Sequence, residues 1–112
     1  MAAIRLKSSH LYIEAPLARE VFGDANKADV VYYPERGTLL LCAPDKEFFH
    51  KMHKTHLMML KDRNAKGDKT IMLTELLIDH EIDDRDRDLN YTVRTETKIL
   101  SIELSSSLSQ LL

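Results

Sequence analysis

The chain has 112 residues, of which 44% are hydrophobic and 30% are charged, and its formal net charge is −2. This length predicts one domain with one core, and the near-neutral charge excludes a simple polycation. No stretch approaches the roughly 18 apolar residues of a membrane span, and the N-terminus lacks the apolar core of a signal peptide. We therefore expect a cytoplasmic protein that does not enter a membrane.

Charge is distributed unevenly along the chain. Residues 1–69 carry a net charge of +3, whereas residues 70–112 carry a net charge of −5. Opposite charges attract, so the two halves are expected to attract each other within one subunit or across a symmetric dimer. Because the chain also has more apolar strand than one helix can cover, we favour a homodimer.

Alternating apolar residues predict strand over residues 3–14. The apolar parity changes at Ser8 and Ser9, which indicates a hairpin turn or a bulge, because a slip of one residue moves side chains to the opposite face. A short helix is predicted over about 16–22, since Pro16 suits a first helical turn and Gly23 suits a left-handed stop.

Two apolar runs, 29–33 and 38–43, are separated by the turn residues of 34–37 and give the clearest hairpin signal in the chain. Gly37 can take the positive φ that such a turn requires. Because both runs are strongly apolar, we expect this hairpin to be central. Cys42 lies in the second run, where we interpret it as a small buried hydrophobic residue rather than a nucleophile.

Residues 10–43 resemble the swapped-hairpin unit of the AbrB and MraZ transcription-regulator families, which run through a strand, a proline, a helical turn and a hairpin. The matching residues are Arg19, Glu20, Phe22, Gly23, Asp29 and Val31. The chain departs from the pattern at Ala28, which stands in place of the turn glycine, and in a longer loop after the helix. The resemblance implies an interleaved dimer that places arginines on DNA, and Arg19 is the residue that carries over.

The longest periodic segment spans residues 43–66. Phe48, Met52 and Met59 recur at helical spacing on one face, which predicts an amphipathic helix over about 45–64 packed on a sheet. Pro44 suits its first turn, and Gly67 follows its predicted end.

Three histidines within this segment, His50, His53 and His56, raise the possibility of a metal site, because imidazoles one helical turn apart can share an ion. Steps of three residues turn each ring by about 60°, so the three do not converge on one ion. We keep His50 and His53 as metal candidates and expect His56 to be buried. No cofactor follows from the sequence.

The C-terminal part is rich in β signals. Residues 70–82 read as a kinked strand, or as a strand that ends near Thr74 and continues as a helical turn. Residues 91–104 read as two strands with a hairpin or bulge near Glu96. Residues 105–112 form a serine-rich tail that we expect to be frayed. An offset of 60 aligns apolar residues of the two halves, which is compatible with two β layers or one mixed sheet.

These patterns predict a single α+β domain over residues 1–104. It would contain a mainly antiparallel sheet of about six strands, one long helix and one short helix. No phosphate loop, nucleophile elbow or zinc-protease motif is present in the sequence, so we predict no catalytic residues. The favoured function is a small interaction or scaffold protein, homodimeric, with a protein partner possible. The alternatives are a swapped-hairpin DNA-binding regulator, disfavoured by charge, and a histidine-dependent or metal-dependent enzyme.

Overall fold

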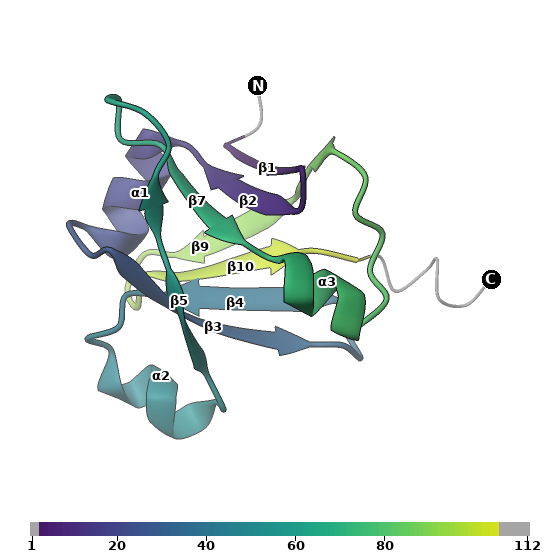
Figure 1. Cartoon of the computed structure of the whole chain (residues 1–112). Coiled ribbons are helices and arrows are strands. Elements are labelled where there is room, and N and C mark those ends of the chain that lie inside the picture. The colour runs from purple at the N-terminus through teal and green to yellow at the C-terminus, as the bar shows by residue number, and fades with distance from the viewer. Residues whose placement is uncertain (1–2, 106–112) are drawn as a thin grey trace.

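The computed structural model describes residues 3–105 as an α+β fold of two five-stranded antiparallel sheets and three short helices (Figure 1). The first sheet has the order β6-β7-β2-β1-β8, and the second has the order β5-β3-β4-β10-β9. The first sheet comprises β1 (Ile4–Lys7), β2 (His10–Ile13), β6 (Lys61–Asp62), β7 (Lys69–Met72) and β8 (Arg87–Asp88). The second comprises β3 (Lys27–Tyr33), β4 (Thr38–Cys42), β5 (His56–Met59), β9 (Tyr91–Arg94) and β10 (Ile99–Glu103). The helices are α1 (Ala15–Phe22), α2 (Glu47–Met52) and α3 (Thr74–Asp79).

Two bent segments join the sheets at their edges. Strand β5 continues through the buried Leu60 into β6, and β8 continues through the buried Leu89 into β9, so each segment gives one strand to each sheet. The inward faces of both sheets form one hydrophobic core. Its fully buried members include Ile4, Leu6, Leu11, Ile13 and Ile71 from the first sheet and Leu39, Leu41, Leu100 and Ile102 from the second.

The chain contains the same series of elements twice. The first series is β2, α1, β3 and β4, and the second is β7, α3, the bent segment of β8 and β9, and β10. Equivalent strands pair with each other in antiparallel fashion, β2 with β7 and β4 with β10. The turns before β4 and β10 each place a residue at positive φ, Gly37 at 64° and Lys98 at 60°. The apolar repeat at an offset of about 60 therefore corresponds to a structural repeat. The sequence was compatible with two β layers or one mixed sheet, and the structure has two β layers.

Several local predictions are confirmed. The predicted helix over 16–22 is α1, and the predicted central hairpin is formed by β3 and β4. The parity change at Ser8 and Ser9 is a hairpin turn between β1 and β2, with both serines at positive φ. The turn near Glu96 joins β9 to β10. These elements follow from local signals, namely turn residues and alternation.

The predicted long helix over 45–64 is wrong. Helix α2 ends at Met52, His53 is extended, with φ −134° and ψ 148°, and the chain then forms β5 beside β3. The expected apolar face is exposed, because 72% of Met52 and 53% of Met59 remain accessible. The cause is non-local: β3 pairs with β4 on one side only, and residues 56–59 satisfy the backbone groups on its other side.

The second difference lies in residues 70–82, where we expected a kinked strand. Strand β7 ends at Met72 and α3 begins at Thr74, so the alternative of a strand followed by a helical turn is the correct one. In α3 only Leu77 is buried, while Ile78 is 70% exposed. Within residues 3–105 the strands number ten rather than about six, because the segment assigned to the long helix supplies β5 and β6 and the polar stretch before β9 supplies β8. The predicted frayed tail lies outside the described residues apart from Ser105.

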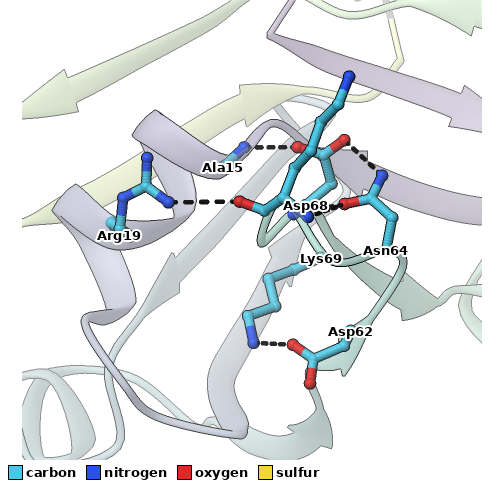
Figure 2. Close-up of polar contacts among 7 residues, drawn as sticks. Ala15, Arg19, Asp62, Asn64, Asp68 and Lys69 are labelled. Carbon is cyan, nitrogen blue, oxygen red and sulfur yellow. Dashed lines mark hydrogen bonds and ion pairs between the residues drawn. The ribbon is translucent and has the colours of Figure 1, made fainter.

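The loop between β6 and β7 is fastened to the start of α1 (Figure 2). The backbone N–H of Ala15 donates to Asp68 Oδ1 at 2.8 Å, and the Asn64 side-chain amide donates to Asp68 Oδ2 at 2.9 Å. Arg19 donates to the Lys66 carbonyl oxygen at 3.4 Å. The hydrogen bonds from Asn64 and Ala15 lower the pKa of Asp68 below its usual 3.8. Asp68 therefore acts as a capping acceptor supplied from a distant part of the chain.

Replacing Asp68 with alanine is expected to lower the free energy of unfolding by about 1 kcal/mol, the usual cost of a lost helix cap. A carboxyl whose pKa is lowered by folding stabilises the protein above its unfolded pKa, and that contribution disappears as pH falls through the lowered value. Urea unfolding at pH 7 and at pH 3 measures both effects. Asp68→Asn keeps an acceptor without the charge, so its loss should be smaller; an Asp68→Ala variant as stable as wild type would contradict the tether.

No helix within residues 3–105 is both long and apolar enough to cross a membrane.

Candidate functional site

A groove of about 630 Å³ lies between β5, β7 and α3. In Figure 1, β5 and β7 approach each other at one end and then diverge, and α3 follows the end of β7. Its apolar lining consists of Leu57, Met58, Met59, Ile71, Met72 and Leu76. Its polar lining consists of His10, His56, Lys61, Thr70, Glu75 and Asp79. The volume is within the range of typical ligand sites.

The groove exists because the hairpin between β6 and β7 opens after two residue pairs. The pairs are Lys61 with Thr70 and Asp62 with Lys69, and the Arg63 N–H donates to the Asp68 carbonyl oxygen at 2.7 Å. In an antiparallel ladder, hydrogen-bonded pairs alternate, so Lys61 with Thr70 is such a pair. The next one would be Met59 with Met72, but the strands have separated there and β5 pairs with β3 instead.

Both sides of the groove consequently present strand backbone that has no strand partner among residues 3–105. The Leu60 N–H donates to the Asn26 carbonyl oxygen at 2.9 Å, so by alternation the backbone groups of Met58 face β3 and those of Leu57 and Met59 face the groove. On the other side, the Leu73 N–H donates to the Ser9 carbonyl oxygen at 2.9 Å, which leaves the backbone groups of Met72 facing the groove. Unpaired strand edges of this kind are templates for another extended chain.

The groove walls expose large apolar side chains above a buried floor. The exposed fraction is 54% for Leu57, 53% for Met59 and 55% for Met72, whereas Ile71 at the floor is 1% exposed. Single exposed apolar residues are common on protein surfaces, but a set gathered around one concavity is typical of an interaction site. Methionine also adapts its shape to different partners.

The charges of the groove are separated along its length. Lys61 lies at the closed end, beside Thr70, while α3 contributes Glu75 and Asp79 beyond the point where the strands part. Residues four apart on a helix are neighbours, so the two carboxylates repel each other. Neither carboxylate has an ion-pair or hydrogen-bond partner among residues 3–105. This wall of the groove is therefore suited to a cation.

The metal candidates His50 and His53 are held separately and form no common site. His50 Nε2 lies 2.8 Å from Asp29 Oδ2 and 3.0 Å from the Pro44 carbonyl oxygen. Nε2 has a single N–H, and its hydrogen bond is with the Pro44 carbonyl. Among residues 3–105, Asp29 Oδ2 therefore lies within ion-pair distance of the imidazole but accepts no hydrogen bond. His53 Nδ1 contacts the Tyr33 hydroxyl, and its ring packs on Phe49 with 4.7 Å between centroids. Within the described part of the chain, no group of three or more His, Cys, Asp or Glu residues is placed to hold a metal ion.

The expectation that His56 is buried is wrong, because it is exposed at the start of β5 and lines the groove. The helix that would have buried its ring is not formed. His10 lines the groove as well, and its Nδ1 carries the hydrogen, since that atom contacts the Ser8 carbonyl oxygen at 2.8 Å and a carbonyl only accepts.

Within the described part of the chain, Asp29 is the polar residue classed as buried, and the sequence did not predict its burial. Its exposed fraction is 1%, and this burial raises the pKa of its carboxyl above the usual 3.8, while the charge of His50 opposes the rise. Cys42 is paired opposite Asp29 across β3 and β4. Burial, and then the nearby Asp29 charge, raise the pKa of the Cys42 thiol to about 12, so at neutral pH it is a protonated, unreactive core residue.

Arg19, the candidate for DNA contact, is exposed on α1 and directed at the Lys66 carbonyl (Figure 2). Arg5, another cation that a DNA surface would need, is paired with Asp88 at 3.2 Å. Arg36 lies over the Tyr33 ring, 4.9 Å from its centroid. Each of these arginines thus has a partner within the protein.

The groove was missed from sequence because one of its walls, residues 56–61, was assigned to the long helix. A usable signal was the turn composition of residues 64–67, Asn-Ala-Lys-Gly, which would have placed a hairpin there and a strand before it. Comparison of the chain with protein-family models, with curated proteins and with solved structures finds no match.

Proposed function

We propose that this protein is an interaction module whose groove between β5 and β7 binds an extended, apolar protein segment that carries a cation. The observation that carries the proposal is the opening of the β6–β7 hairpin at Met59 and Met72, which leaves two strand edges facing one apolar concavity. Peptide recognition by addition of a strand to an open sheet edge is a common mode of binding.

Charge selects the chemistry of the occupant. The unpaired carboxylates of Glu75 and Asp79 favour a lysine or arginine at the open end of the groove, and Lys61 disfavours one at the closed end. A segment that runs antiparallel to β5 would have its C-terminal end near α3. The segment that fits has alternating apolar residues followed by a cation.

Fluorescence anisotropy with the labelled, amidated peptide Leu-Thr-Leu-Thr-Lys-Lys tests the proposal. Wild-type protein should bind it, and binding should weaken with added salt, because the contacts with Glu75 and Asp79 are near the surface. The peptide with glutamates in place of lysines should bind at least about tenfold more weakly, which corresponds to about 1.4 kcal/mol.

The variant Met72→Lys should weaken binding of the lysine peptide at least about tenfold, because it removes apolar wall and adds a like charge. The matched control is Met52→Lys, the same change at a methionine that is 72% exposed on α2 and outside the groove lining. Equal affinity of the two variants, or no binding by wild type, would overturn the proposed function.

A further inference from the structure

Of the four edge strands that residues 3–105 form, β5 is the one that carries no Asp, Glu, Lys or Arg. Strands β6, β8 and β9 contain Lys61 and Asp62, Arg87 and Asp88, and Arg94, respectively, whereas β5 reads His-Leu-Met-Met. Charged residues on edge strands are the usual protection against pairing with another chain. The edge of β5 lacks that protection, and its exposed Leu57 and Met59 add apolar area to it.

The segment from Leu57 to Lys61 has the properties proposed for the segment that binds in the groove. It is extended, apolar and followed by a cation. Two copies of β5 can pair in antiparallel fashion only through residues whose backbone groups face outward, which are Leu57 and Met59. Pairing Leu57 of one copy with Met59 of the other puts a two-fold axis at Met58. The axis generates the second pair, Met59 with Leu57, so the outward backbone groups of both residues are hydrogen-bonded in both copies.

This register also matches the charges. With the axis at Met58, the pairing of the two copies ends at Met59, because the outward backbone groups of Lys61 pair with Thr70 of the same copy. The second copy continues from Met59 through Leu60, which brings its Lys61 toward the open end of the first copy's groove. The carboxylates of Glu75 and Asp79 lie at that end, because α3 starts beyond the point where Met59 and Met72 part. The two-fold axis repeats the contact, so both lysines approach the acidic pairs of the opposite copy.

We infer that the segment bound in the groove is β5 of a second copy of this chain, so that the two second sheets join edge to edge in a two-fold dimer. The inference rests on the proposed function, since it names the partner of the same groove. The dimer covers Leu57 and Met59, which are more than half exposed in one copy.

Sedimentation equilibrium of three proteins, alone and mixed, tests the inference. Wild type should dimerise at micromolar concentration. Lys61→Glu places like charges at both contacts, as does the double variant Glu75→Lys with Asp79→Lys, and each should weaken self-association by about 10-fold to 100-fold. An equimolar mixture of these two variants restores opposite charges at both contacts, so it should form a heterodimer of near wild-type affinity.

The controls are Lys51→Glu and the double variant Glu35→Lys with Glu96→Lys, which make the same charge changes at exposed sites outside the groove. They should dimerise as wild type does, and circular dichroism checks that every variant is folded. A monomeric wild type at about 100 µM, or variants that fail to complement each other, would overturn the inference. The proposed function fails in a different experiment: if it is wrong, wild-type protein at concentrations where it is monomeric does not bind the lysine peptide. If only the dimer is wrong, the peptide still binds.

Discussion

Replacing Leu41 with alanine is expected to lower the free energy of unfolding by about 2–5 kcal/mol, the range for a leucine removed from a packed core. Leu41 is fully buried on β4 and lies opposite the fully buried Leu100 of β10, where the two halves of the repeat meet. A loss of this size is a large fraction of the 5–15 kcal/mol typical of a domain. Urea denaturation followed by circular dichroism measures it.

The matched control is Leu57→Ala, the same change at a leucine that is 54% exposed on β5. Its cost should be below about 1 kcal/mol, because little apolar area is lost. Both variants are measured at concentrations at which wild type is monomeric. Equal costs would place Leu57 in a core and would contradict the groove.

Replacing His50 with alanine is expected to cost about 1–3 kcal/mol, because it removes the hydrogen bonds to the Pro44 carbonyl and the Thr55 hydroxyl and takes the imidazole away from the buried Asp29 carboxyl. His50 is held by three contacts: the Asp29 carboxylate, the Pro44 carbonyl, and the Thr55 hydroxyl, 3.3 Å from Nδ1. These contacts connect α2 and the start of β5 to β3. A second variant, Asp29→Asn, removes the negative charge of this side chain and keeps its shape, so it isolates the effect of the charge on stability.

The pH dependence of Asp29 has a definite sign. Because burial raises the pKa of its carboxyl, Asp29 favours folding in the acid range, where it is protonated, and this contribution is lost as pH rises from 3.8 through the raised value. The stability of Asp29→Asn relative to wild type should therefore increase over that interval. The double variant Asp29→Asn with His50→Ala should lose less free energy of unfolding than the sum of the losses of the two single variants, because the two side chains are in contact. A pH-independent difference between Asp29→Asn and wild type would contradict the burial of a charged Asp29.

Local signals predicted the elements that local chemistry determines. Pro16 and Gly23 bounded α1, and the turn at 34–37 with Gly37 at positive φ located the central hairpin. Residues 45–64 could not be predicted in this way, because their helical spacing competes with a tertiary interaction. Strand β5 supplies the hydrogen-bond partners for one side of the β3 backbone. The side chains of β5 do not signal that pairing, because it depends on where β3 lies in the fold.

The turn at residues 64–67 could have located the β6–β7 hairpin, but the opening of that hairpin into a groove could not be predicted from sequence, for a related reason. Met59 and Met72 would be an ordinary ladder pair if the β6–β7 hairpin continued, and nothing in their side chains signals that the strands separate. The histidines attracted attention because of their spacing, but His50 and His53 are held by neighbours that are distant in sequence, Asp29 and Tyr33. Asp29 itself lies in an apolar run, where its burial could have been suspected but its partner could not.

An amide-resolved NMR titration of ¹⁵N-labelled monomeric protein with the lysine peptide tests the central claim most directly. The account predicts that chemical-shift changes concentrate on β5, β7 and α3, and that the amides of Leu57, Met59 and Met72 exchange more slowly with solvent when the peptide is bound. Changes centred instead on α1 and the β3–β4 hairpin, around Arg19 and Arg36, would contradict it and would place the binding surface on the opposite part of the repeat.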